Sequence, residues 1–459
     1  MSCQQQILFD RENRHNLISS LTENHNVISV KANVAGGCKN IYPSFVLCNY
    51  FANVIYKKWG YKPIIDQNSD GVCYIFALND DFDYKAFAID LEENTPIGRF
   101  VDIDVHLKNT SASISRNKTR KCYLCDNPAF VCGRLKSHPI SQLNDFLTQK
   151  TNEFFTQKIS EIIKFSLVTE LELENKFGLV TKNSKGSHAD MDYNLMLTAQ
   201  DSIIDTLTQG FFVGLTENTP EHFIDLLRPM GLECENKMFT KTGGVNAYKG
   251  FIFISLILLS AIGYTIKTCR QFDDIFEIAK QIATHPSVDK PLETFGYNAY
   301  TNNFLGLRGE TKKGFPSVKN ACEMLNYNSL HKVLTTIVSQ IDDSVLLKRA
   351  KTIDNYNHFK NLISSVDTRD ENALISLTDY CIQNNVSIGG SADVLCASIM
   401  LNKLKEILKP AVLQYAKINP LSFFKKTMIN SLVQHNKPVD AIAIEDFFKK
   451  LEDKPKFII

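Results

Sequence analysis

The sequence lacks a large excess of charge of either sign. Its 459 residues include 51 Lys and Arg against 50 Asp and Glu, which leaves a formal net charge of +1. A protein that attracts nucleic acid through its overall field carries a clear basic excess. The balance therefore argues against that class.

Marks of export and of membrane insertion are also missing. The opening stretch MSCQQQILFDRENRH is polar and has neither an apolar region nor a small-residue cleavage site. The longest apolar run, at 250–266, falls short of the ~20 residues that a spanning helix needs, so we predict a buried central helix. Twelve cysteines without a secretory signal indicate a cytoplasmic protein with reduced thiols.

No internal repeat, low-complexity tract or heptad pattern is present, which argues against solenoid, disordered and coiled-coil architectures. The hydrophobic share of 44% is ordinary for a globular protein. A chain of this length is expected to form more than one domain.

The beginning of the chain favours a mixed α/β (α+β) fold. Runs rich in β-branched and aromatic residues predict strands at 25–34, 72–78 and 100–107. An apolar-periodic segment that ends at Gly60 predicts a helix between the first two strands. This order predicts a sheet with helices packed on it.

From Ile140 onward, long amphipathic segments predict a larger all-α domain. We place the domains at 1–150 and 151–459, and expect only short helices after Pro420. The predicted helical segments are 140–171, 190–209, 219–228, 250–285, 317–340, 355–364, 371–384 and 391–417.

Two aspartates are the sharpest local feature of the first domain. In the strand predicted at 100–107, side chains alternate between faces, so Asp102 and Asp104 project to the same side. Two carboxylates at this spacing can share a Mg²⁺, which prefers a few carboxylates plus substrate phosphates. An edge strand with two solvated aspartates fits the pattern equally well.

A cysteine-rich segment follows. Cys122, Cys125, Cys132 and His138 match the ligand set of a structural Cys₃His zinc site, provided that the turn between Cys125 and Cys132 is tight. Reduced core cysteines, or a loop that binds phosphate, explain these residues without a metal.

PIGRFVDIDV at 96–105, RKCYLC at 120–125, and then Cys132, Arg134 and His138 occur in the order and spacing of one family. On these motifs, residues 1–150 resemble the citrate lyase holo-acyl-carrier-protein synthases; Asp10-Arg11 and Lys39 are weaker correspondences. The resemblance implies a nucleotidyltransferase-type domain. It would transfer a 5′-phosphoribosyl-dephospho-coenzyme A group from its triphosphate precursor to a serine of the citrate lyase acyl carrier protein (the gamma subunit), releasing pyrophosphate.

The resemblance also implies roles for individual residues. Asp102 and Asp104 would hold Mg²⁺. The candidates for the triphosphate are Arg99, Arg134 and Lys136, because guanidinium forks match phosphate oxygens.

Four loop segments interrupt the helical part. In the first, 176–192, we expect Ser187 to cap a helix with Asp190 at the capping-box position, and Asp192 one turn beyond His188. In the second, Arg228 is followed by Gly243, Gly244 and Lys249 just before a long helix, a plausible site for phosphate. A tight turn that feeds a buried helix explains those glycines equally well.

The third segment contains Arg308 and Glu310. In the fourth, Gly389 and Gly390 precede Ser391, an expected N-cap, and Asp393 falls in the first helical turn. Each of these motifs taken alone favours a structural role.

Together the four segments resemble triphosphoribosyl-dephospho-coenzyme A synthase over about residues 160–405. The resemblance implies an all-helical enzyme that joins ATP to 3′-dephospho-coenzyme A and expels adenine. A ribose hydroxyl must attack the anomeric carbon of ATP, and carboxylates stabilise the charge that develops on the ribose. The candidate acids are Asp190, Asp192, Glu310 and Asp393. The candidates for gripping the nucleotide and its Mg²⁺-bound triphosphate are Arg228, Gly243, Gly244, Lys249, Arg308, Gly389 and Gly390.

This part departs from the family pattern. Phe177 and Thr181 replace the Pro and Asp of K-P-G-L-V-D, and Ala247-Tyr248 stand where Thr-His is usual. Asp342-Asp343-Ser344 and Lys348-Arg349-Ala350 replace the usual D-T-N and Arg-Gly-Gly segments. Because the acids are otherwise present, we expect an active synthase.

The combined hypothesis is a bifunctional transferase that makes the activated triphosphate and uses it on a carrier protein. One alternative keeps the chemistry but acts on a malonate decarboxylase carrier protein. A second has a catalytically decayed helical part that serves as a docking module. A third, a zinc-dependent nucleic-acid binder, rests on the three cysteines and the basic run 116–121, and the neutral charge argues against it.

Overall fold

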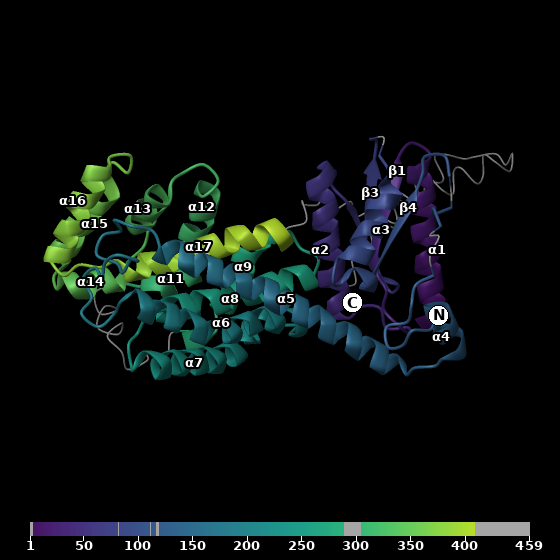
Figure 1. Ribbon diagram of the computed structural model, residues 1–459, viewed down its shortest axis with the longest axis horizontal. Coiled ribbons are helices and arrows are strands. Elements are labelled where there is room, and N and C mark those ends of the chain that lie inside the picture. The colour runs from purple at the N-terminus through teal and green to yellow at the C-terminus, as the bar shows by residue number, and fades with distance from the viewer. Residues whose placement is uncertain (1–2, 81, 111, 116–118, 289–303, 409–459) are drawn as a thin grey trace, which may run out of the picture.

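The computed structural model describes residues 3–80, 82–110, 112–115, 119–288 and 304–408. Within them, a sheet-containing part near the N-terminus and a longer helical part lie next to each other along the longest axis (Figure 1). The short helices predicted after Pro420, and the end of the helix predicted over 391–417, lie outside the described residues.

A four-stranded antiparallel sheet organises the N-terminal part, in the order β2-β3-β1-β4. Its strands are β1 (Asn26–Ala32), β2 (Ile64–Asn68), β3 (Gly71–Leu78) and β4 (Val101–His106). Three of them occupy the runs predicted as strands. The pattern analysis does not predict β2, because its sequence IIDQN contains only two apolar residues.

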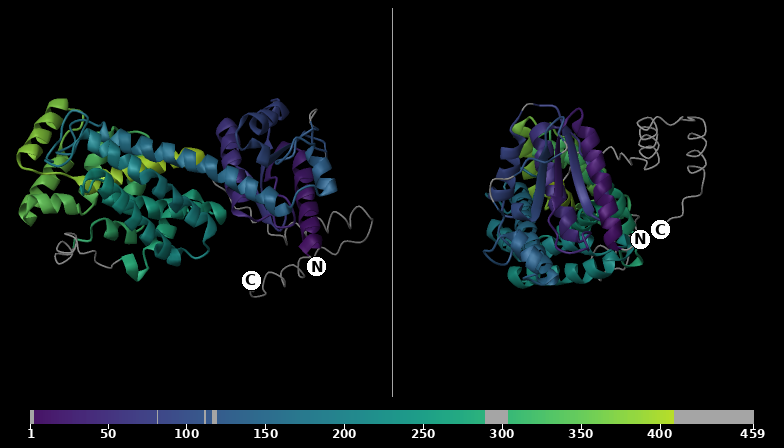
Figure 2. Two further views of the ribbon diagram at one scale, coloured as in Figure 1. Left: turned by 60° about the horizontal axis from the view of Figure 1, so that its bottom comes forward. Right: turned by 90° about the vertical axis from the view of Figure 1, so that its right-hand side faces the viewer.

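Different helices cover the two faces of this sheet (Figures 1 and 2). Ile28 and Val30 of β1 join the core with α2 (Tyr42–Trp59) and α3 (Tyr84–Asn94). On the other face, Val27 packs with Ile18 of α1 (Cys3–Thr22), a mostly polar helix that the pattern analysis does not predict. The sheet is thus a layer between helices.

The pairing register of β1 and β4 decides which side chains point to the face of the sheet that α1 covers. β1 and β4 pair so that Lys31 lies opposite Asp102 and Ser29 opposite Asp104. Val101, Ile103 and Val105 alternate with the aspartates and are buried in the main core. Both carboxylates therefore leave β4 on the same face as Lys31.

A single helix joins the two parts. The 32 residues of α5 (Ile140–Leu171) span roughly 48 Å at 1.5 Å per residue. The Tyr42 hydroxyl of α2 donates to Asn152 of α5 at 2.7 Å, and Phe155 of α5 packs on both Tyr50 and Phe211. Residue 150, where we placed the domain boundary, lies inside this helix, and one hydrophobic core continues across it.

The helical part is built around α8 (Lys249–Lys267), which packs against α6 (Tyr193–Thr216) and α17 (Gly389–Leu408). In the described part of the chain, α8 is the one helix long and apolar enough to cross a membrane, and 78% of that stretch is buried inside the protein. The remaining longer helices are α7 (Phe223–Thr242), α9 (Ile275–Ile282), α11 (Gly306–Lys312), α12 (Pro316–Met324), α13 (Leu330–Gln340), α14 (Ser344–Ala350), α15 (Ile353–Ser365) and α16 (Glu371–Gln383).

Two of the long predicted helices are interrupted. The segment 250–285 breaks after α8, where Cys269 has a positive φ of 52° and Gln271 begins a capping box with Asp274. The segment 317–340 breaks before Ser329, whose hydroxyl caps α13. Both breaks come from local capping residues that apolar periodicity does not register.

Phe155→Ala should destabilise both parts together, because its ring is fully buried between them. Removing a buried Phe side chain costs about 3–5 kcal/mol, so we expect a lower urea midpoint. Phe165→Ala is the control, since that ring of the same helix is 48% exposed. Equal midpoints for the two variants would contradict the shared core.

Candidate functional site

The paired aspartates lie on an edge strand. Asp102 accepts a hydrogen bond from Arg120 Nη1 at 2.5 Å, and its side chain is 46% exposed. Partial desolvation, together with the neighbouring charge of Asp102, raises the pKa of Asp104. Like charges held this close favour a cation between them.

Arg120 also fixes this edge. Its Nη2 donates to the buried Glu92 of α3 at 2.5 Å, and the same Glu92 oxygen accepts from the Ile103 N–H at 2.7 Å. The carboxylate of Glu92 therefore ties helix, strand and Arg120 together.

The four residues of the cysteine segment converge. The ligand atoms of Cys122, Cys125, Cys132 and His138 all lie within 4.8 Å of one another. The Cys125 and Cys132 sulfurs are 3.5 Å apart, and His138 Nε2 is 3.3 Å from Cys125 Sγ. Although burial opposes it, the pKa of Cys122 is lowered, because backbone N–H groups of Leu124 and Cys125 donate to its sulfur.

The tight turn that this cluster needs is present. The Cys122 N–H donates to the Asn127 carbonyl at 2.8 Å, and the backbones of Lys121 and Pro128 pair in an isolated antiparallel β-bridge. α4 (Ala129–Leu135) then carries Cys132, and Lys136 ends it in the left-handed conformation. These turns return the chain so that His138 meets the cysteines.

The predicted triphosphate ligands of this part are dispersed. Arg99 Nη2 donates to the carbonyls of Lys121 at 3.1 Å and Cys122 at 2.5 Å, so it supports the cysteine loop. Arg134 stacks over Phe130 on the surface. Lys136 lines a cavity of about 750 Å³ next to the cysteine cluster.

The first loop of the helical part differs locally from its prediction. Ser187 does not cap a helix: its hydroxyl donates to the Val386 carbonyl, and the chain stays irregular until α6 begins at Tyr193. Asp192 is the N-cap instead and accepts from Leu195 N at 3.0 Å. Asp190 is exposed in the loop.

His188 in this loop is held by a distant helix. Arg349 of α14 donates to its Nδ1 at 2.9 Å, and Nε2 lies 3.0 Å from Ser387 Oγ. An arginine can only donate, so Nδ1 accepts and Nε2 carries the proton. Burial, with the charge of Arg349, lowers the pKa of His188 to about 4.

The glycine pair before α17 faces a carboxylate. The buried Asp343 accepts from the N–H groups of Gly390 at 3.3 Å and Ser391 at 2.7 Å, and from the Ser391 hydroxyl at 2.8 Å. It also caps α14 by accepting from the Val345 N–H. α17 begins at Gly389, so Ser391 lies inside the helix and is not its N-cap.

Asp393 packs on the start of α8. A Cβ added to Gly250 would lie 2.1 Å from its carboxylate oxygen, so only glycine permits this approach. The Phe251 N–H of the same helix start bonds to it. Desolvation, with the charges of Asp343 and Glu170, raises the pKa of Asp393 well above its ordinary value.

Next to Asp393 lies a buried polar layer. Lys176 is fully buried and donates to Glu170 Oε1 at 2.7 Å. The Tyr248 hydroxyl accepts from Gln200 Nε2 at 2.8 Å. Within the described chain, Gln200 Oε1 is buried without a hydrogen-bond partner.

Glu310 belongs to the same neighbourhood. Its carboxylate accepts from Ser317 N at 2.6 Å and so holds the start of α12. Burial raises the pKa of Glu310, and the charge of Asp342 adds to this effect. Arg308 lies one half-turn earlier on α11.

The glycine loop before α8 behaves as a turn. Gly243 ends α7 at φ 69°, and Gly244 follows at φ 92° with its N–H bonded to the Phe239 carbonyl. Lys249 pairs with Glu235 at 2.9 Å, on the side of α7. Arg228 lies on α7, before Pro229.

The structure therefore gathers some candidates and separates others. Five acids are linked by their charges: Asp393 with Asp343 and Glu170, and Glu310 with Asp342. They come from α5, α11, α17 and the two residues that precede α14. We call them the interior acidic cluster: Glu170, Glu310, Asp342, Asp343 and Asp393. The other two acids lie apart from this cluster. The charge of Asp190 works to raise the pKa of His188 and of Arg349, and Asp192 caps the start of α6.

Two family models match consecutive parts of the chain. The model for apo-citrate lyase phosphoribosyl-dephospho-CoA transferase matches residues 3–154, and that for ATP:dephospho-CoA triphosphoribosyl transferase matches residues 156–411. The chain belongs to both families. It is a fused, bifunctional transferase; we call residues 3–154 the transferase part and residues 156–411 the synthase part.

Three similar proteins cover one or both of these parts. A "Protein CitXG" of Leuconostoc mesenteroides subsp. cremoris is 29% identical over 366 residues, which cover 70% of this chain and 78% of the relative. Another of Haemophilus influenzae is 27% identical over 357 residues, covering 69% and 76%. A 2-(5''-triphosphoribosyl)-3'-dephosphocoenzyme-A synthase of Haemophilus ducreyi is 28% identical over 322 residues, covering 61% of this chain and 99% of the relative.

Several residues that organise the synthase part were not predicted as site residues from the sequence. Glu170 enters through its ion pair with Lys176 and its charge on Asp393. Asp343, noted only within a departure from the family pattern, bonds to the start of α17. Arg349, noted solely as a departure from the family pattern, fixes the tautomer of His188. Lys176, Asp343 and Arg349 all lie in segments that correspond to family motifs, whereas Glu170 lies in none of them.

His188 should make the stability of the synthase part fall with acid. As pH drops from about 6.5 to 4, the unfolded chain binds a proton here that the folded chain rejects. The free energy of unfolding should therefore fall by up to about 3 kcal/mol over this window. Urea unfolding of His188→Asn should show a shallower pH dependence, and the exposed His15→Asn should match the wild type. Parallel curves for all three would contradict the buried neutral imidazole.

Proposed function

We propose that the transferase part acts on the acyl carrier protein of citrate lyase, its gamma subunit, with Asp102 and Asp104 as the metal-binding pair. Membership of the family supports the carrier, and the shared face and raised pKa of Asp104 support the pair. Mg²⁺ bound there would neutralise charge on the substrate phosphates.

The transfer balances as a phosphoryl substitution. The carrier serine oxygen bonds to the phosphorus next to the ribose of the precursor, while the bond from that phosphorus to the bridging oxygen breaks. Pyrophosphate leaves with the bonding electrons, and a base takes the serine proton. The exposed position of Asp104 on an edge strand lets an incoming protein serine approach.

In the synthase part we assign the chemistry to the interior acidic cluster. Asp343 is occupied by backbone donors, so it positions α17. Asp393 has the environment of a protonated carboxyl, which suits a donor of the proton that departing adenine needs. The ribose hydroxyl of 3′-dephospho-coenzyme A then bonds to the anomeric carbon as the bond from that carbon to adenine breaks, and the proton that this hydroxyl loses restores the carboxyl of Asp393. To Glu310, which interacts with Asp342 next to Asp343, we assign the balancing of the positive charge on the ribose.

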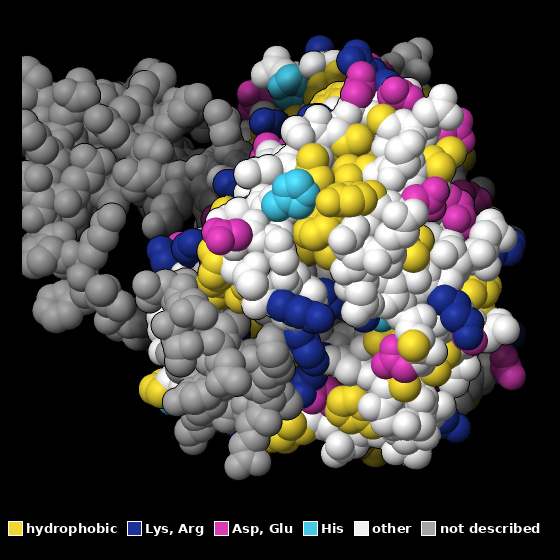
Figure 3. Space-filling view, turned by 90° about the vertical axis from the view of Figure 1, so that its left-hand side faces the viewer, with side chains coloured by type: hydrophobic (Ala, Val, Ile, Leu, Met, Phe, Trp, Pro, Cys, Tyr) yellow, Lys and Arg dark blue, Asp and Glu magenta, His cyan; other side chains and the backbone are white. Residues whose placement is uncertain are grey.

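We look for the groups that bind the triphosphate of ATP among the basic residues of the synthase part. A group of Lys and Arg side chains lies near the centre of the end face of the synthase part (Figure 3). Arg308 shares α11 with Glu310 and is the candidate nearest to the cluster along the chain. Lys249 is paired with Glu235, so binding there would require exchange of that ion pair.

A structural zinc ion fits the cysteine segment of the transferase part. Tetrahedral zinc places thiolate and imidazole ligands within 4 Å of one another, as the Cys125, Cys132 and His138 contacts do. Arg99 donates to the carbonyls of Lys121 and Cys122, so the metal would order the loop that Arg99 supports. The cysteines whose side chains are described are all free thiols, which suits the cytoplasm.

One assay divides the two activities. The purified chain with ATP, Mg²⁺ and 3′-dephospho-coenzyme A should release adenine, and added apo-carrier protein should then gain the mass of the prosthetic group. Asp102→Asn and Asp104→Asn should lose at least a hundredfold of the mass gain and keep adenine release, because each removes a metal ligand. Asp393→Asn is the reciprocal control: it should lose adenine release, yet still add the group to the carrier protein when the triphosphate precursor is supplied directly, as it is for this comparison in every variant. A joint loss of both activities in either variant would refute the division.

Purified protein should contain one zinc per chain by elemental analysis. Cys125→Ser should lose it and unfold at lower temperature, since a structural zinc contributes folding free energy. Cys38→Ser, an exposed cysteine of the same part, should keep the metal. Zinc-free wild-type protein of unchanged stability would exclude the site.

A further inference from the structure

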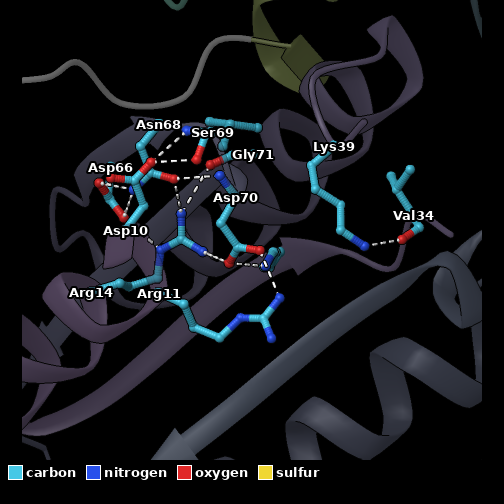
Figure 4. Close-up of polar contacts among 12 residues, drawn as sticks. Asp10, Arg11, Arg14, Val34, Lys39, Asp66, Asn68, Ser69, Asp70 and Gly71 are labelled. Carbon is cyan, nitrogen blue, oxygen red and sulfur yellow. Dashed lines mark hydrogen bonds and ion pairs between the residues drawn. The ribbon is translucent and has the colours of Figure 1, made fainter. Parts of the chain in front are cut away.

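A buried aspartate gathers basic residues on the α1 face of the transferase part (Figure 4). Asp70 has no exposed side-chain surface. It accepts from Arg11 at 2.9 Å and from Arg14 at 2.8 Å, and it pairs with Lys31 of β1. One carboxylate thus meets three cations from two separate elements.

The turn between β2 and β3 holds Asp70 in place. Asn68 Oδ1 accepts from the Asp70 N–H at 2.9 Å, and Gly71 follows at φ 91°. Asp10 of α1 accepts from both the backbone and the hydroxyl of Ser69. Helix and turn therefore form one rigid unit.

Arg14 is the structural member of the group. Besides Asp70, it donates to Asp66 at 2.5 Å, to Asn68 at 3.1 Å and to the Gly71 carbonyl at 2.9 Å. Its side chain is only 7% exposed. It is fully engaged within the protein.

Arg11, Lys31 and Lys39 are less fully engaged than Arg14. Arg11 is 55% exposed and has one ion pair. The ammonium group of Lys39 donates to the Val34 carbonyl at 2.5 Å. Lys39 also packs against the turn, because a Cβ added to Gly71 would lie 3.2 Å from the Lys39 Cβ. Burial, then the charges of Lys31 and Arg11, lowers the pKa of Lys39. These cations are crowded together with one carboxylate among them.

The whole group keeps a positive excess. It contains four cations, Arg11, Arg14, Lys31 and Lys39, and three carboxylates, Asp10, Asp66 and Asp70. Asp66 is paired with Arg14, and Asp10 accepts from Ser69. A multivalent anion would relieve this repulsion.

The group also lies where the chemistry needs an anion site. Lys31 is the register partner of Asp102. Lys39 lines the cavity of about 750 Å³ that reaches Lys136, so a ligand has room beside it. Arg99, predicted for the triphosphate, is committed to the carbonyls of the cysteine loop.

We propose that Arg11, Lys31 and Lys39 form a polyphosphate-binding subsite, which takes the terminal phosphates of the precursor and holds the pyrophosphate that leaves. The inference rests on the proposed transfer reaction and adds its leaving-group site. The bound phosphates would lie beside the cations while the phosphorus next to the ribose reaches Asp102.

Calorimetric titration of the full chain with inorganic pyrophosphate tests the subsite. Arg11→Gln and Lys39→Gln should each weaken one binding event about tenfold, the effect of losing one charge-assisted hydrogen bond. Lys39→Arg should retain binding. In the transfer reaction, the same two Gln variants should raise the KM for the triphosphate precursor about tenfold with a smaller change in kcat. Lys62→Gln, an exposed lysine of the same part, is the matched control.

The outcomes separate the subsite from the reaction. Pyrophosphate binding unchanged in both Gln variants, or weakened equally by Lys62→Gln, overturns the subsite. Binding that depends on Arg11 and Lys39 without any mass gain of the carrier protein keeps the subsite and overturns the proposed transfer. Because Arg11 is largely exposed, its variant stays folded and decides the matter if Lys39→Gln does not fold.

Discussion

The synthase part depends on carboxylates placed at the starts of helices. Asp192 caps α6, Glu310 holds the first turn of α12, Asp343 bonds to the first turn of α17, and Asp393 lies against the first turn of α8. An unsatisfied helix start carries free N–H donors and a partial positive charge. In three of these cases the acid comes from a different helix, so the same bond that satisfies the backbone also fixes one helix against another.

This arrangement changes the meaning of the glycine motifs. A glycine-rich helix start is a natural place for phosphate, yet the donors before α17 are taken by Asp343, and Gly250 makes room for Asp393. The glycines permit close approach of an acid. Substitution of the family's usual His by Tyr248 also has a local answer, because its hydroxyl bonds to Gln200 within the buried polar layer.

Local sequence patterns predicted those features of the site that depend on residues close together in the chain. Strict alternation placed Asp102 and Asp104 on one face, and ligand spacing placed three cysteines and His138 within reach of each other. The roles of Asp343 and Arg349 depend on partners far away in the chain, Ser391 and His188, for which spacing carries no information. The expected cap at Ser187 was wrong because that hydroxyl bonds to Val386, almost two hundred residues later.

Helix α5 and its neighbour α17 set the distance between the two chemistries. Asn53 of α2 holds the Glu406 carbonyl of α17, thirteen positions beyond Asp393, and thirteen helical residues span about 20 Å. The α2 layer and the sheet still lie between that contact and Asp102. Because α5 runs unbroken through both cores, the structure offers no flexible linker between the two parts within the described residues. On the site assignments proposed above, a triphosphate made beside Asp393 would have to leave the synthase part before it reached Asp102, so one copy of the enzyme could supply another.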